Sequence, residues 1–95
     1  MFVVLLRFSN NKDKASELMA AHNVWIARGI ADGVFLLVGS LMPRAGGALL
    51  AHNTTQAALE ARMREDPFVS SDVVGVELLE ISPSKADARL GFLLG

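Results

Sequence analysis

Residues 33–43 read GVFLLVGSLMP, and this stretch decides the fold. Glycine commonly ends helices and proline commonly ends strands. The apolar run over residues 34–42, between Gly33 and Pro43, is therefore predicted to be a strand. Successive side chains of a strand point to opposite faces. The two faces read Val34, Leu36, Val38, Ser40, Met42 and Phe35, Leu37, Gly39, Leu41. Both are mainly apolar, so the strand needs cover on both sides.

The residues before this stretch predict a first strand and a helix. Residues 2–8 are apolar apart from Arg7, and the Ser9-Asn10-Asn11 segment after them is typical of a helix start. Over residues 12–32 the apolar side chains recur every three or four positions, which is the period of a helix. They are Ala15, Leu18, Met19, Trp25, Ile26, Gly29 and Ile30.

The residues after the stretch predict a turn, a strand, a helix and a last strand. The AGG segment at residues 45–47 is predicted to form the turn, and residues 48–52 the third strand. The NTT segment at residues 53–55 offers N-caps for a helix that runs through Glu65. Pro67 disfavours a helical conformation at Asp66 and ends this helix. Residues 73–82 form the last strand, which Pro83 stops.

This order of elements, βαββαβ, predicts an α+β fold of the ferredoxin-like type, in which a four-stranded antiparallel sheet carries two helices on one face. Residues 1–83 are expected to form this single domain, and residues 84–95 a C-terminal tail. Because no third helix is predicted, we expect a second copy of the chain to cover the other apolar face, in a homodimer or a larger oligomer. The alternative is that the extra apolar side chains are simply exposed.

The composition excludes several classes of protein and of site. Of the 95 residues 52% are hydrophobic, which is typical of a chain that folds. Nine Lys and Arg against ten Asp and Glu give a net charge of -1, so no nucleic-acid partner is expected. Without cysteine or a His-x-x-x-His pair, neither a metal nor a cofactor is expected. No apolar run approaches the roughly 20 residues of a membrane span, and we expect a cytoplasmic protein without a signal peptide.

His22 is the first candidate for chemistry. It lies on the apolar stripe of the predicted helix, four positions after Leu18 and three before Trp25, which is an unusual place for an ionisable side chain. Imidazole changes its protonation state near neutral pH and can act as a general acid or base. The alternative is a packed histidine whose ring nitrogen bonds to the backbone or to water. The other histidine, His52, is expected to be a solvated loop residue.

Asp66 is the candidate partner of His22. In a βαββαβ fold both helices run in the same direction over the sheet. His22 lies about ten residues into the first helix and Asp66 about twelve past the start of the second, so at about 1.5 Å per residue the two reach similar levels. The alternative is that Asp66 caps a turn that begins at Pro67. The two roles are compatible, since a cap uses only one carboxylate oxygen.

Four segments together carry a family resemblance: AHNVW at residues 21–25, GVFLLVGS at 33–40, PRAGG at 43–47 and EDPFV at 65–69. In their order and spacing the chain resembles the YciI-like family of the dimeric α+β barrel superfamily, up to about Pro83. The resemblance implies a βαββαβ fold, a sheet-to-sheet dimer, and a His and Asp pair in a small cleft, here His22 and Asp66. Some members act as dehydrochlorinases in the catabolism of chlorinated aromatic ring compounds, which implies proton abstraction and loss of a leaving group.

We therefore expect a small enzyme with lyase-like or isomerase-like acid–base chemistry on a small, aromatic or lactone-like molecule. His22 would be its general base or acid, and Asp66 would orient the imidazole. The alternative function is a non-catalytic accessory protein that binds a small ligand or forms oligomers.

Five further residues are candidates for substrate contact. Trp25 and Phe68 flank the pair and would either wall the pocket or only join the core. Gly39 and Ser40 are expected to border the pocket. Arg44 would either bind a carboxylate or phenolate or remain a solvated charge.

The C-terminal tail carries the last feature of note, four large apolar side chains close to its end. They are Leu90, Phe92, Leu93 and Leu94. Such residues are costly to expose on a free segment, so we expect them to pack on the partner subunit or on a neighbouring dimer.

Overall fold

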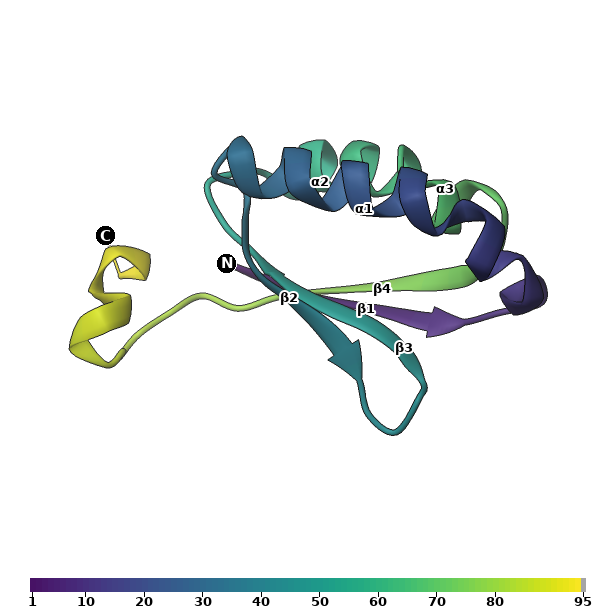
Figure 1. Ribbon diagram of the computed structural model, residues 1–95. Helices are drawn as coiled ribbons and strands as arrows, with labels where there is room; N and C mark the ends of the chain where they lie inside the picture. The colour runs from purple at the N-terminus through teal and green to yellow at the C-terminus, as the bar shows by residue number, and fades with distance from the viewer. Residues whose placement is uncertain (95) are drawn as a thin grey trace.

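Four strands and two longer helices follow one another in the predicted order, in a computed structural model that describes residues 1–94. They are β1 (Phe2–Phe8), α1 (Ala15–Ala31), β2 (Phe35–Leu41), β3 (Gly46–Ala51), α2 (Gln56–Arg64) and β4 (Val74–Glu80). Shorter helical turns are η1 (Lys12–Lys14), α3 (Pro67–Ser70) and η2 (Ala88–Leu93). All strand pairs are antiparallel, in the order β2-β3-β1-β4. The helices α1, α2 and α3 lie on one face of the sheet, which confirms the predicted ferredoxin-like α+β fold (Figure 1).

Helix α1 ends at Ala31, and Gly33 shortly after it terminates the helix. Gly33 has a φ of 74°, in the left-handed region that favours glycine. Its N–H donates to the Ile30 carbonyl oxygen at 3.0 Å, and the Val34 N–H donates to that of Gly29 at 3.1 Å. These two bonds satisfy carbonyl groups that the end of the helix would otherwise leave unpaired. The chain can then turn directly into β2.

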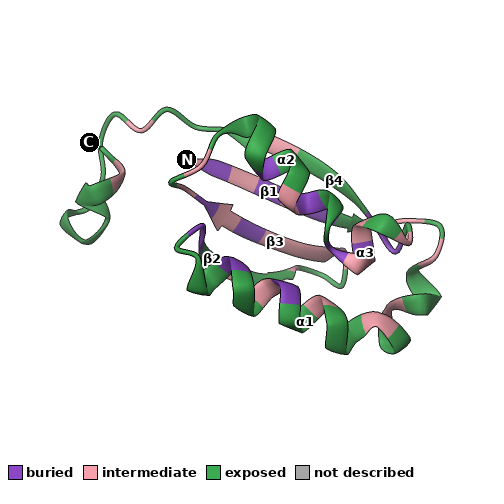
Figure 2. Cartoon of the chain, turned by 90° about the horizontal axis from the view of Figure 1, so that it is seen from above, coloured by how far each residue is buried: buried purple, intermediate pink, exposed green. Residues whose placement is uncertain are grey.

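The core lies between the sheet and the helices. Its strand residues include Val4 and Leu49, and the helices α1 and α2 add Trp25, Leu59 and Met63. Figure 2 shows buried stretches on β1, β3, α1, α2 and α3. The Trp25 indole N–H donates to the Arg62 carbonyl oxygen at 3.0 Å, so the buried ring also ties α1 to α2.

Strand β2 contains a bulge that the sequence pattern did not reveal. Phe35 pairs with Ala51 and Leu37 pairs with Leu50, so Leu36 is an extra residue without a partner on β3. The bulge changes the alternation, and the prediction that Phe35 shares a face with Leu37 is wrong, because Phe35 is buried and Leu37 is 61% exposed. Phe35 is buried on the helix side, with its ring 5.1 Å from that of Trp25 in an edge-to-face arrangement. A Cβ on Gly29 would collide with the Phe35 ring, so glycine at this position lets α1 approach β2 closely.

The hairpin turn and the third strand are displaced from their predicted positions. The turn lies at residues 42–45, and Gly46 and Gly47 are the first two residues of β3 instead of part of the turn. Gly46 has a φ of 133°, and a Cβ there would collide with the Leu6 carbonyl oxygen. Glycine is therefore required at residue 46 because β1 and β3 approach each other closely.

The expectation of only two helices is also corrected. The short helix α3 follows α2 after a break at Asp66, whose side chain caps it by accepting the Phe68 N–H at 3.0 Å. Since α3 lies on the same side as α1 and α2 (Figure 1), no helix within residues 1–94 covers the other face of the sheet.

This helix-free face is largely apolar. Leu37 is 61% exposed and Leu79 is 46% exposed on it, and the Arg7–Glu77 ion pair lies near one end. Val3, Leu5 and Leu50 are half-buried along the same face. The homodimer that would cover it stays a prediction.

The C-terminal segment extends away from the sheet and ends in η2 (Figure 1). The Asp87 side chain accepts hydrogen bonds from the Arg89 side chain and backbone N–H, and the side-chain bond is the main cause that holds the pKa of Asp87 below its usual value. The Phe92 and His52 rings meet in an edge-to-face arrangement at a centroid distance of 5.5 Å. Across residues 1–94, no helix has both the length and the apolar character needed to cross a bilayer.

Candidate functional site

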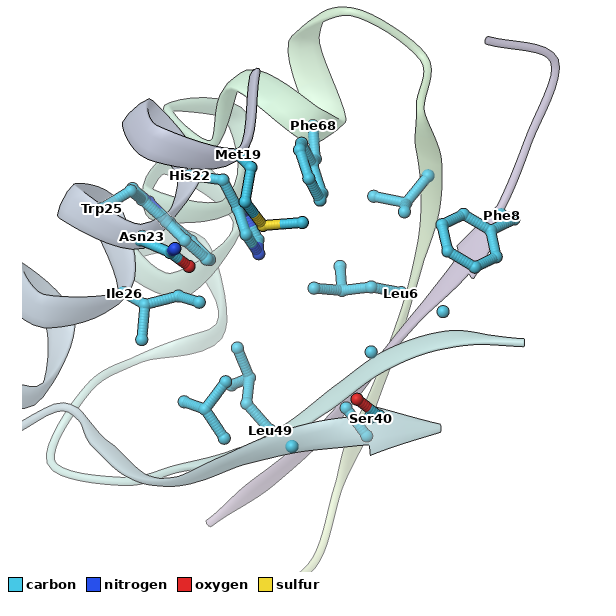
Figure 3. Close-up of a pocket in the computed structure, with 16 residues that line it drawn as sticks. Leu6, Phe8, Met19, His22, Asn23, Trp25, Ile26, Ser40, Leu49 and Phe68 are labelled. Atoms are coloured by element: carbon cyan, nitrogen blue, oxygen red, sulfur yellow. The ribbon is translucent and has the colours of Figure 1, made fainter. Parts of the chain in front are cut away.

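A pocket of about 340 Å³ lies between α1, α3 and the strands (Figure 3). Helix α1 contributes five side chains to its wall, α3 contributes one, and the sheet forms the floor. The lining residues are Met19, His22, Asn23, Trp25 and Ile26 of α1, Phe68 of α3, and Leu6, Phe8, Val38, Gly39, Ser40, Gly46, Gly47, Ala48, Leu49 and Val74 of the strands. The wall is therefore mostly apolar and aromatic. Among residues 1–94, His22 is the only ionisable side chain that lines it.

His22 and Asp66 meet at one side of this pocket. The Nδ1–H of His22 donates to Oδ1 of Asp66 at 2.7 Å. The His22 side chain is 12% exposed, and that of Asp66 is fully buried. A carboxylate can only accept a hydrogen bond, so Nδ1 carries the hydrogen and Nε2 is left to meet a ligand. Figure 3 shows the imidazole directed from α1 into the pocket.

The local sequence explains why Asp66 reaches this point. Helix α2 ends at Arg64, and Pro67 opens α3 with Asp66 as its N-cap. Oδ1 of Asp66 accepts from both His22 and the Phe68 N–H. The two alternatives for Asp66, a partner of the imidazole and a helix cap, are therefore combined in one oxygen. Oδ2 is buried and finds no donor within residues 1–94.

Aromatic rings hold the imidazole from both sides. The Phe68 ring stacks on His22 at a centroid distance of 3.9 Å with an angle of 4° between the planes. The Trp25 ring lies 5.8 Å from His22 at 24°. Both aromatic side chains line the pocket and are 6% exposed, so each is a wall and a core residue at once.

The other predicted contact residues are distributed unevenly. Gly39 and Ser40 line the pocket on the strand side. Arg44 lies in the exposed turn between β2 and β3 with a φ of 48°, and it is not one of the lining residues. Within residues 1–94, no three His, Cys, Asp or Glu side chains gather in a way that could hold a metal ion.

Several lining residues were not singled out from the sequence. Met19 and Ile26 stand three before and four after His22, the spacing of neighbours on one helix face, so periodicity could have found them. Gly47 lies opposite Ser40 across the β2–β3 pair. Gly47 is the last residue of the PRAGG segment, but only the register of the strands places it in the pocket.

Chemically, this arrangement can transfer a proton. Nε2 of His22 can take a proton from a ligand in the pocket or give one to it, and the Asp66 carboxylate stabilises the imidazolium that forms. The stacked rings and the hydrogen bond fix the orientation in which Nε2 meets the ligand.

Comparison with known proteins places this geometry in a family. The sequence matches the YCII-related domain over residues 1–84. No sequence among the curated proteins matches the chain. Among solved structures, the chain is similar to 5-chloro-2-hydroxyhydroquinone dehydrochlorinase (TftG) from Burkholderia phenoliruptrix AC1100, in complex with 2,5-dihydroxybenzoquinone. The TM-score is 0.70 at 12% identity, over 85% of this chain and 93% of that chain, so the likeness is one of fold. The match over residues 1–84 shows that the chain belongs to the family of proteins with a YCII-related domain.

Proposed function

We propose that the chain is a small lyase-like or isomerase-like enzyme that uses His22 as its general acid–base group on an aromatic or lactone-like ring compound. The observation that carries the proposal is the His22–Asp66 hydrogen bond of 2.7 Å, with Asp66 fully buried and Nε2 left for the pocket. A structural role for His22 requires only that its nitrogens are satisfied. It does not require a pocket at the second nitrogen.

The pocket is suited to a single ring. Its volume of about 340 Å³ falls within the roughly 300–1,000 Å³ of small-ligand sites. Phe8, Trp25 and Phe68 offer aromatic surface, and Ser40 and Asn23 offer polar groups. The dehydrochlorinase with a similar fold supports a ring substrate with a leaving group. On such a compound, the ring would first change to its keto tautomer, in which the hydrogen of one ring hydroxyl moves to the carbon that bears the chlorine and that hydroxyl becomes a carbonyl. His22 would then take the proton of a second ring hydroxyl, the electron pair of that O–H bond would form a second carbonyl, the ring double bond would shift, and the C–Cl bond would break. The products would be a quinone, a chloride ion and a proton held by His22.

The test is to offer the protein chlorinated hydroxyhydroquinones and chlorinated hydroquinones and to measure turnover by the release of chloride. We expect His22→Ala to fold and to lose about 100-fold or more in kcat/KM, the usual contribution of a positioned general base. His52→Ala is the matched control, because this second histidine lies outside the pocket, and it should retain wild-type turnover. Undiminished turnover by a folded His22→Ala protein would contradict the proposal.

A non-catalytic role is the second candidate. It is favoured by the lining of the pocket, in which His22 is the only ionisable side chain within residues 1–94. Binding of ring compounds by the wild-type protein without any turnover, and equal affinity in His22→Ala, would support a ligand-binding accessory protein instead.

We further propose that the protein works as a homodimer or a larger oligomer through the helix-free face of the sheet. The exposed Leu37 and Leu79 side chains on that face support this assembly, since exposed apolar patches mark interaction sites.

A further inference from the structure

Two adjacent glycines begin β3, and the backbone requires only the first. Gly46 has a φ in the left-handed region, and a Cβ there would collide with the Leu6 carbonyl oxygen. Gly47 has no such φ, and a Cβ there would lie 3.5 Å from the Gly39 carbonyl oxygen and 3.9 Å from Leu6 Cδ1. These are ordinary van der Waals distances, so an alanine fits. Glycine inside a strand is also less favourable than residues with a side chain. Folding alone therefore does not explain glycine at residue 47.

The register of the sheet shows where the missing side chain would point. Gly47 pairs with Leu6 of β1 on one side and with Ser40 of β2 on the other. Residues in such a row share one face of the sheet, and Leu6, 4% exposed, faces the helices. All three residues line the pocket. Figure 3 shows Leu6 and Ser40 on the strand side, across from His22. The absent side chain of Gly47 thus leaves open space in the pocket floor.

We propose that Gly47 is the size-determining position of this pocket. In this proposal, which rests on the ring-binding function above, one edge of a flat ring enters the gap between Leu6 and Ser40 and contacts the Gly47 backbone. The Ser40 hydroxyl then meets a ring hydroxyl or carbonyl oxygen at that edge. The ligand class is narrowed to flat single rings with an oxygen substituent on this edge, because a bulky substituent would collide with the strand.

The experiment combines thermal unfolding with calorimetric titration of Gly47→Ala and Gly47→Val. The probes are 2,5-dihydroxybenzoquinone, chlorohydroquinone and hydroquinone. The control is Gly75→Ala on β4, paired with Arg7 on the opposite face, where a Cβ would meet nothing within 4 Å. We expect Gly47→Ala to melt at or above the wild-type temperature and yet to bind the best probe about tenfold more weakly, with a larger loss for Gly47→Val. Gly75→Ala should bind like the wild type.

Each outcome decides between the two proposals. Wild-type affinity in both Gly47 variants would overturn the role of Gly47 and leave that of His22 standing. A lower melting temperature of Gly47→Ala with unchanged affinity would assign the glycine to folding and would also overturn the proposal. If none of the probes binds the wild-type protein, the ring-binding function and the role of Gly47 fail together.

Discussion

At the scale of single residues, the unusual feature is that Oδ1 of Asp66 serves two donors. It holds the His22 imidazole and caps α3 through the Phe68 N–H, while Oδ2 is buried without a donor in residues 1–94. A buried polar atom without a partner is costly, and such atoms are rare in folded proteins. The position of the imidazole and the start of α3 therefore depend on one carboxylate.

Substitution at Asp66 should separate these two roles. Asn is as good an N-cap as Asp, so we expect Asp66→Asn to unfold close to the wild-type temperature. Its neutral amide no longer stabilises the imidazolium, so turnover should fall at least about tenfold. Asp66→Ala loses the cap as well, and should cost about 1 kcal/mol or more in the free energy of unfolding. Circular dichroism melts and the chloride assay measure both effects.

Thr55→Ala is the control for the cap alone. The Thr55 side chain caps α2 by accepting the Ala58 N–H at 3.1 Å, outside the pocket. Its loss should lower stability and leave turnover intact. Equal turnover in Asp66→Asn and wild type would remove Asp66 from the mechanism and leave it as a cap.

At the scale of elements, glycines and prolines explain how much the sequence predicts. Gly33 ends α1 and Pro67 separates α2 from α3, so the order of elements could be predicted from residue types with fixed backbone preferences. The bulge at Leu36 could not, because an extra residue in an apolar strand leaves the composition unchanged and only shifts which side chains share a face. Register also decides which further strand residues join Gly39 and Ser40 in the pocket floor, so Leu6 and Gly47 could not be predicted there.

The same distinction applies to the candidate site. His22 could be found because an ionisable residue interrupts an apolar helical stripe, and Asp66 because helix lengths give its level over the sheet. The sequence could not show that His22 and the Phe68 N–H share Oδ1 of Asp66, since this depends on the direction in which α3 starts from Asp66. Arg44 is only two residues before the lining residue Gly46, yet it lies in an exposed turn and is itself exposed.

The C-terminal element carries its own prediction. Leu90 is 46% exposed and Phe92 is 55% exposed, although η2 is capped and held by Asp87. Ordered apolar side chains on an extended segment are typical of a surface that packs on another subunit. We expect deletion of residues 90–95 to lower the melting temperature or to change the oligomer. Identical melting and elution of the truncated and full chains would contradict a packing role.

At the scale of the whole molecule, the helix-free face predicts the mass in solution. Light scattering after size exclusion at micromolar concentration should give about twice the 10.2 kDa of one chain. Leu37→Arg, on the edge strand β2 of that face, should shift the mass towards one chain, because a charge cannot be buried unpaired in an apolar interface.

Val24→Arg is the matched control for this substitution. Val24 is 60% exposed, as Leu37 is 61% exposed, but it belongs to α1 on the other side of the sheet. It should leave the mass unchanged. A folded monomer for the wild-type protein at micromolar concentration would refute the assembly.

Strands β2 and β3 connect subunit assembly to the pocket. On one face they form the pocket floor, and on the other they form part of the helix-free face. Val38 and Leu49 pair on the helix side, and the next pair, Gly39 and Ala48, belongs to the helix-free side while its backbone still borders the pocket. Only one layer of backbone separates a ligand from a partner subunit. In the proposed dimer, ligand binding in the pocket and association of the two subunits are therefore thermodynamically linked. Any factor by which a bound ligand raises the affinity between subunits must equal the factor by which dimerisation raises the affinity for the ligand. For a ligand that binds the dimer more tightly than the monomer, diluting the protein would dissociate the dimer and so weaken ligand binding.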